Sequence, residues 1–306
     1  MTTPDQEAAR KRAAISRPHT TPEFRPLSSS VTVEIAAASH RGAARASNDD
    51  HYLVVRLGRS QHTLATSLSA ADLPAPFEEQ GYAMVVADGL GAGGAGSVAS
   101  RVALSALAHL ALEQGKWNLR VDPTTAAEIL ERLQMFHARA DAEVFAKSRT
   151  GPILSEIAAS LTSAYSAGDN LFIAHVGHSR AYLFRNGFLT RLTRDHTIEG
   201  QVANANGPVA VERHAQDLRH ILTDAIGAGG SAPPVDVEQF RLVDGDSVML
   251  CTNGLTDVVH EEQIAEVLAR PRRLQEQCDL LAELARQRPA EDNLTVVLAR
   301  YRVPNV

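Results

Sequence analysis

Apolar and polar positions alternate over short runs in two parts of the 306-residue chain, and this pattern predicts two groups of strands. The first group covers residues 31–36, 52–57 and 82–87. The second group covers residues 161–166, 170–175, 180–185, 188–192, 235–242, 247–251 and 294–301. Gly168-Asp169 and Asn186-Gly187 are typical two-residue hairpin turns, so we expect their flanking strands to pair antiparallel.

Apolar residues at helical spacing predict two pairs of amphipathic helices. The first pair, 96–114 and 125–147, separates the two strand groups, and Asp122-Pro123 with Thr124 as N-cap marks the start of its second helix. The second pair, 261–269 and 274–286, precedes the last strand. This layout predicts an α+β fold in which mainly antiparallel sheets pack on one another with helices outside.

Three segments lack such periodicity. Residues 1–30 contain four prolines and several charges, which predicts a mobile N-terminal tail before a single domain spanning 31–303. Residues 60–80 are mixed in polarity and are expected to form a surface insertion. Residues 197–230 are a candidate mobile flap.

Composition narrows the class of protein. The net charge of −6 and the absence of a basic stripe with interleaved aromatic residues argue against a nucleic-acid partner. Two cysteines without a C-x-x-C pair indicate neither a disulfide framework nor a thiolate zinc site, and they favour a reducing cytoplasm. No apolar run has the length of a membrane span and no secretory signal is visible, so we expect no membrane partner.

Carboxylates or their amide isosteres stand at four predicted junctions of a strand and a loop. The four corners are Asn48-Asp49-Asp50, Asp88-Gly89, Asn253-Gly254 and Asp292-Asn293. Mg²⁺ and Mn²⁺ prefer oxygen ligands from a few convergent carboxylates and carbonyls, so the corners together predict a hard-cation site. Taken singly, each corner is also common turn chemistry.

The second corner opens a glycine-rich loop that has two interpretations. Gly89, Gly91 and Gly94 match the G-x-G-x-x-G pattern of nucleotide-binding enzymes. However, the preceding strand ends in Asp88 and no βαβ unit follows, so the nucleotide hypothesis rests on the loop alone. Glycines in such a loop also allow the backbone to approach a ligand closely.

Six ordered segments resemble the motif series of the metal-dependent Ser/Thr protein phosphatases of type 2C. They cover residues 45–50, 86–91, 174–182, 192–197, 250–257 and 291–296. The resemblance extends from about residue 35 to 301 and implies a four-layer αββα sandwich with a binuclear Mn²⁺ or Mg²⁺ centre. It also implies hydrolysis of phosphoserine and phosphothreonine in a phosphoprotein substrate, such as that of a Ser/Thr kinase, by a cytoplasmic monomer.

The resemblance assigns roles residue by residue. The implied metal residues are Asp49, Asp50, Asp88, Gly89, Asn253 and Asp292. Asp88 would bridge both cations, and Gly89 would contribute its carbonyl. Arg45 would hold the substrate phosphate, for which a guanidinium fork is geometrically suited. Arg45 and Asp88 are thus the candidate catalytic residues.

Two departures from the family pattern affect this expectation. The family usually has the motif Gly-Asp-Ser-Arg, and His178 takes the place of its aspartate. Asn253 also stands where the family usually has an aspartate. Loss of charge predicts one weakened metal site, and the imidazole of His178, a possible accessory ligand, favours Mn²⁺ over Mg²⁺. The alternative hypothesis is a pseudophosphatase that binds phosphoproteins or acts as a regulatory module. The sequence leaves Asp257 as a turn or capping residue and assigns His220 no metal role.

Overall fold

The computed structural model describes residues 27–73, 76–113, 117–206, 218, 220–229, 231–288 and 292–304. Most of the predicted N-terminal tail and part of the predicted flap lie outside the described residues. Within the described ranges, none of the helices combines the length and the apolar character needed to cross a bilayer.

In the described ranges, ten strands form two five-stranded sheets in which every paired strand is antiparallel. The first sheet has the order β1-β10-β9-β6-β7, and its strands are β1 (Thr32–His40), β10 (Leu294–Arg302), β9 (Ser247–Cys251), β6 (Arg180–Arg185) and β7 (Phe188–Arg191). The second has the order β2-β3-β4-β5-β8, and its strands are β2 (Asp50–Gln61), β3 (Phe77–Leu90), β4 (Ala158–Ala167), β5 (Asn170–Val176) and β8 (Asp236–Arg241). The antiparallel pairing predicted from the hairpin turns is confirmed.

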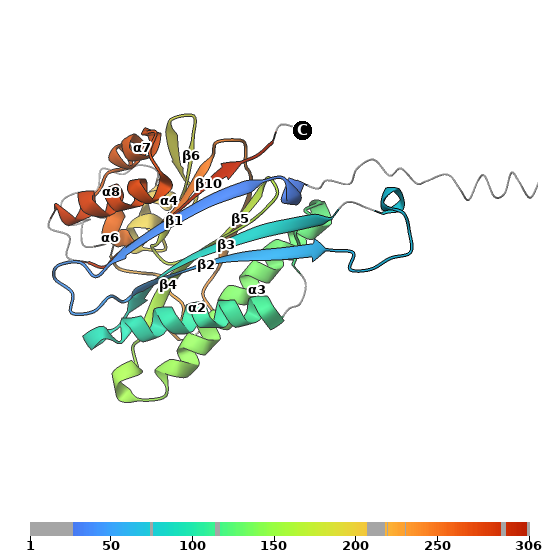
Figure 1. The fold of residues 1–306 in the computed structure, drawn as a ribbon. Coiled ribbons are helices and arrows are strands. Elements are labelled where there is room, and N and C mark those ends of the chain that lie inside the picture. The colour runs from blue at the N-terminus through green and yellow to red at the C-terminus, as the bar shows by residue number, and fades with distance from the viewer. Residues whose placement is uncertain are drawn as a thin grey trace, which may run out of the picture.

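Helices cover the outer faces of both sheets (Figure 1). Helices α2 (Gly96–Glu113) and α3 (Pro123–Ser148) pack on the second sheet, and α7 (Glu261–Ala269) and α8 (Leu274–Arg286) pack on the first. Asp122 rather than Thr124 caps α3, because its carboxylate accepts a hydrogen bond of 2.7 Å from the Thr125 amide. Two further helices in the described residues are α4 (Ile198–Asn206) and α6 (Asn253–Thr256).

The core follows the period-two alternation of the strands. Met84 and Val86 of β3 face the first sheet and meet Leu250 and Val297 between the sheets. Val85, from the same strand, points to the opposite face and packs under α2 and α3. A third apolar layer joins the first sheet to α7 and α8. The predicted four-layer αββα sandwich is therefore confirmed.

The hairpin β2–β3 is longer than the sequence pattern predicts. The expected insertion at 60–80 is wrong at both ends, because β2 continues to Gln61 and β3 starts at Phe77. The start of β3 could not be recognised from hydropathy, because it contains the charged residue Glu79. The Glu79 side chain is nevertheless fully buried and forms ion pairs with Arg59 and Arg120. In the predicted flap, Ile198–Asn206 forms α4, although no helical period was visible there.

Candidate metal centre

Two aspartates at adjacent strand ends form the floor of the candidate centre. Asp50 opens β2 and Asp88 lies near the end of β3, and the antiparallel register places them directly opposite each other. Asp50 is 3% exposed and Asp88 8% exposed. Facing carboxylates at this depth are costly without a positive partner, because burial disfavours charge and like charges repel.

The glycine-rich loop brings the start of α2 onto this floor. A Cβ on Gly89 would lie 2.0 Å from the carbonyl oxygen of Gly96, and a Cβ on Gly96 would lie 2.9 Å from Asp49 Oδ2. Ser100 of α2 also donates a hydrogen bond of 2.6 Å to the Asp49 carbonyl. Close packing of helix on strand thus accounts for these glycines, with no need for a bound nucleotide.

The β9–α6 junction supplies the next two polar groups. The Thr252 hydroxyl donates a hydrogen bond of 2.7 Å to Asp50 Oδ2 and accepts one of 2.9 Å from the Thr295 amide. Asn253 follows as the first residue of α6, and its Nδ2 donates to Asp257 Oδ2 at 3.1 Å. Asp50 Oδ1 and Asn253 Oδ1 are buried and have no hydrogen-bond partner among the described residues.

Asp292 completes the candidate centre and forms an ion pair with Arg45. The Arg45 Nε lies 3.0 Å from Asp292 Oδ1, and the arginine side chain is 54% exposed. Asn293 ties the two loops together, since its Oδ1 accepts from the Asp49 amide at 2.8 Å and its Nδ2 donates to the Ser47 carbonyl at 2.9 Å. An exposed guanidinium beside a buried acidic floor is suited to receive an anionic substrate.

The electrostatics show an excess of negative charge in this cluster. Burial and, next, the charge of Asp292 raise the pKa of Asp88 to about 8, while Arg45 opposes the shift. Burial and the charge of Asp88 raise the pKa of Asp50, against the hydrogen bond from Thr252. These groups would be stabilised as carboxylates by a divalent cation, which inverts the local balance of charge.

The donor set fits a hard cation held partly by water. In the ranges that the structure describes, no three Asp, Glu, His or Cys side chains are arranged to hold an ion by themselves. Mg²⁺ commonly uses only one or two carboxylates and keeps several waters. Carboxylates of Asp88 and Asp292, the Gly89 carbonyl and the unpartnered Asn253 oxygen supply ligands of this kind. Asp50 Oδ1 remains available to hydrogen-bond a water.

His178 lies beside the floor but is already engaged with a serine. Its Nδ1 is 2.7 Å from Ser160 Oγ and 3.7 Å from Asp88 Oδ2. Its main-chain amide donates to the same Ser160 hydroxyl at 3.1 Å. Burial lowers the pKa of His178, which favours the neutral imidazole. Its accessory ligand role stays a prediction.

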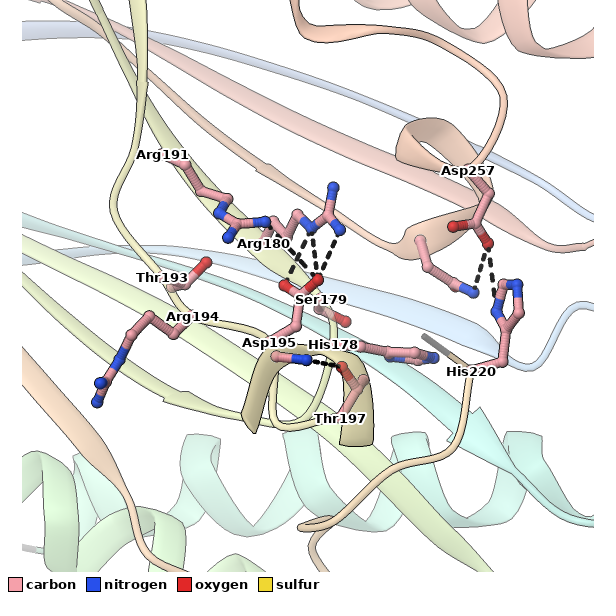
Figure 2. A network of polar contacts seen from close by, with 12 residues as sticks. His178, Ser179, Arg180, Arg191, Thr193, Arg194, Asp195, Thr197, His220 and Asp257 are labelled. Atoms are coloured by element: carbon pink, nitrogen blue, oxygen red, sulfur yellow. Dashed lines mark hydrogen bonds and ion pairs between the residues drawn. The ribbon is translucent and has the colours of Figure 1, made fainter. Parts of the chain in front are cut away.

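A polar network surrounds the base of the predicted flap (Figure 2). Arg180 forms a bidentate salt bridge with Asp195, with Nη2 2.6 Å from Oδ2 and Nε 3.0 Å from Oδ1. Burial alone would raise the pKa of Asp195, but the hydrogen bonds and charge of Arg180 outweigh it and lower the pKa. Arg180 therefore pairs with a carboxylate inside the fold.

Sequence reasoning missed several residues of this region. Thr252 and Ser160 are uncharged, and their contacts depend on strand register rather than on any local pattern. Asp257 was interpreted as a turn or capping residue, yet it binds the Asn253 amide. The spacing of four residues within a short helical segment was the available signal, because residues i and i+4 share a helix face.

The fold and the acidic floor define a class of protein, and comparison with known families agrees. The family model for Protein phosphatase 2C matches residues 74–292, and the chain belongs to this family.

Among curated relatives, Serine/threonine protein phosphatase PstP of Mycobacterium tuberculosis is 30% identical over 270 residues, covering 88% of this chain and 45% of PstP. This chain therefore spans about half the length of PstP. Serine/threonine phosphatase stp of Listeria monocytogenes is 31% identical over 215 residues, covering 70% of this chain and 82% of stp. Among solved structures, the catalytic domain of PstP in complex with two manganese ions superposes with a TM-score of 0.66 at 28% identity, covering 89% of this chain and 99% of that one.

Proposed function

We propose that this chain is a divalent-metal-dependent phosphatase that hydrolyses phosphoserine and phosphothreonine in proteins, through a domain spanning 31–303. The carrying observation is the buried pair Asp50 and Asp88, which lies next to Asp292; among the described residues, no lysine or arginine forms an ion pair with either carboxylate of this pair. The similarity to PstP, whose catalytic domain was solved with two manganese ions, supports the same use of the site.

Each residue has a defined task in this proposal. Bound Mn²⁺ or Mg²⁺ supplies a water of lowered pKa and neutralises charge on the phosphoryl oxygens. Asp88, Asp292, the Gly89 carbonyl and Asn253 hold the ions. Arg45, exposed at the mouth, binds the phosphate of the substrate and orients it over the floor.

The acidic residues of the first corner act through water. Asp50 offers its unpartnered Oδ1 as an acceptor and so orients water beside the ions. Asp49 shares the task, although Ser47 already donates a hydrogen bond of 2.8 Å to its Oδ1. Acceptors fixed by strand and loop geometry require little reorganisation during the reaction.

We further propose that the ion next to Asn253 binds weakly and that Mn²⁺ is preferred to Mg²⁺. An amide oxygen keeps the reach of a carboxylate but lacks its charge. Asn253→Asp, alone or with His178→Asp, should therefore tighten Mn²⁺ binding and raise turnover. The substitutions at these two positions also favour a second candidate, a pseudophosphatase that binds phosphoproteins. A monomeric state, a cytoplasmic location and a link to a Ser/Thr kinase stay predictions.

Asp88→Ala distinguishes the two candidates. With an aryl phosphate and a phosphothreonine peptide in millimolar Mn²⁺, the parent should hydrolyse both, and the variant should lose about 100-fold or more. Asp279→Ala removes an exposed carboxylate from α8 and should leave turnover unchanged. Parent turnover no higher than that of Asp88→Ala would favour the pseudophosphatase.

A further inference from the structure

We infer that Asp257 is a positioning residue, which fixes the side-chain amide of Asn253 so that its oxygen, and not its NH₂ group, faces the cation. The inference deepens the proposed function and rests on it for the presence of the cation. Two observations carry it: the contact between the two side chains, and the buried oxygen that this contact leaves free.

The contact between the two residues is double. Asn253 Nδ2 donates to Asp257 Oδ2 at 3.1 Å, and the Asp257 main-chain amide donates to the Asn253 carbonyl at 2.8 Å. The second bond closes one helical turn and holds the two side chains on one face. Asn253 is 7% exposed, so its amide has little room to find other partners.

The hydrogen-bonding chemistry of the Asp257 carboxylate determines the orientation of the Asn253 side-chain amide. A carboxylate oxygen only accepts hydrogen bonds, so the NH₂ group of Asn253 must face Asp257. The carbonyl oxygen Oδ1 then points away from Asp257, and it is buried without a hydrogen-bond partner in the part of the chain that the structure describes. The reverse orientation would oppose two oxygens and present N–H groups to a cation. Aspartate needs no such partner, because either of its oxygens can bind a cation.

The same carboxylate also contacts a residue within the predicted flap. His220 Nδ1 lies 3.7 Å from Asp257 Oδ2, the oxygen that accepts from Asn253 (Figure 2). The His220 side chain is 49% exposed, so this contact is a minor stabilising interaction. His220→Ala therefore provides a variant that removes one neighbour of Asp257 without touching the amide.

A double-mutant cycle of Asp257→Ala and Asn253→Ala tests whether Asp257 acts through Asn253. By calorimetric Mn²⁺ titration, Asp257→Ala should weaken binding about 10- to 100-fold, as is typical for residues that orient metal ligands. In the Asn253→Ala background the same change should add little, because no amide is left to orient. Additive losses would overturn the inference.

The chain contains a matched control for this cycle. On the outer face of α8, Gln275 Nε2 donates to Asp279 Oδ1 at 3.0 Å, which is the same amide-to-carboxylate contact at the same spacing of four residues. Asp279→Ala should leave Mn²⁺ affinity unchanged. Asp257→Asn keeps an acceptor for the Asn253 amide and should recover most of the affinity that Asp257→Ala loses. Equal losses in Asp257→Asn and Asp257→Ala would contradict a role in orientation.

A charge exchange gives an independent test. Asn253→Asp with Asp257→Asn leaves the net charge unchanged but moves the carboxylate from the positioning residue to the ligand. We expect this double variant to bind Mn²⁺ at least about tenfold more tightly than the parent, because a carboxylate binds a cation better than an amide. Equal affinity would show that only the total charge matters and would overturn the inference.

Failure of the inference and failure of the proposed function have different signatures. In the metal-free protein, Asp257→Ala should shift the side-chain ¹⁵N and NH₂ resonances of Asn253, while Asp279→Ala should not. Unchanged Asn253 resonances in Asp257→Ala would overturn the inference regardless of activity. A parent that binds Mn²⁺ with the predicted non-additive cycle but hydrolyses no phosphoester would overturn the proposed function alone.

Discussion

Asp88 and Asp195 are two aspartates of nearly equal burial in very different surroundings. Their side chains are 11% and 12% exposed, respectively. The pKa of Asp88 is raised to about 8 by burial and by Asp292, whereas the pKa of Asp195 is lowered by the hydrogen bonds and charge of Arg180. Burial is therefore common to both, and the partner decides the sign of the shift.

The difference between the two pKa shifts distinguishes an aspartate with a structural role from an aspartate of the candidate metal centre. Asp195 has its counter-ion built into the chain, so it fixes the base of the predicted flap. Asp88 faces Asp50 across the strand pair, and Arg45, whose charge opposes the rise in the pKa of Asp88, is half exposed and forms an ion pair with Asp292. A carboxylate cluster left in this state is explained by a cation that is not part of the chain.

The largest effect on stability is expected at the paired aspartate. Asp195→Asn leaves the Arg180 guanidinium largely buried without its carboxylate partner, and it should lower the free energy of unfolding by about 3 kcal/mol. Chemical denaturation at pH 7 measures this loss. A loss below about 0.5 kcal/mol would place the pair among surface ion pairs and would weaken the comparison.

The same pair sets an expected pH dependence. Because the folded-state pKa of Asp195 is lowered, its contribution is fully present above its unfolded value near 3.8 and is lost as the pH falls through the folded value. The stability difference between parent and Asp195→Asn should accordingly shrink below about pH 4. A difference that stays constant from pH 7 into this acid range would contradict the assignment.

A smaller effect is expected at the mouth of the site. Arg45→Ala should lower kcat/KM for a phosphopeptide about tenfold, equivalent to about 1.4 kcal/mol, mainly through KM. It should not weaken Mn²⁺ binding, because removing Arg45 frees Asp292 from its ion pair. Steady-state kinetics and Mn²⁺ calorimetry on the same variant separate the two roles. Weaker Mn²⁺ binding in Arg45→Ala would assign the arginine to the support of the metal centre.

The smallest effect concerns the metal-free protein. Asp88→Asn removes an ionisable group from the acidic floor and should raise the free energy of unfolding by about 1 kcal/mol without metal. With millimolar Mn²⁺ the order should reverse, since only the parent gains the full binding energy. Thermal unfolding with and without Mn²⁺ shows both signs. If Asp88→Asn destabilised the metal-free protein, the negative charge of the acidic floor would be compensated by groups of the chain itself, which would contradict the account.

Much of the fold could be predicted from sequence, because strand alternation, hairpin turns and helical spacing are local patterns. The Asn186-Gly187 turn joins β6 to β7 where the pattern placed it. The length of β2 and β3 could not be predicted, because Glu79 is buried by means of arginines that are distant in sequence. Salt-bridged charge inside a strand is indistinguishable from surface polarity in a hydropathy pattern.

The site was predictable to the extent that it lies at strand ends. The four acidic corners were found because each follows or precedes an apolar run, and the structure brings Asp50 and Asp88 face to face. Ser160 escaped notice because its contact with His178 depends on the register of β4 against β5. The sequence pattern predicted that Asp257 is a turn or capping residue. Its hydrogen bond to Asn253 became visible in the structure.

A crystal of this protein grown with millimolar Mn²⁺ and measured at the manganese absorption edge tests the central claim most directly. Anomalous peaks should lie between Asp88, Asp292 and the Gly89 carbonyl, with the peak next to Asn253 weaker than its neighbour and with Asn253 Oδ1 facing it. An acidic floor without an anomalous peak, with Asp50 and Asp88 joined by a shared proton instead, would contradict the account.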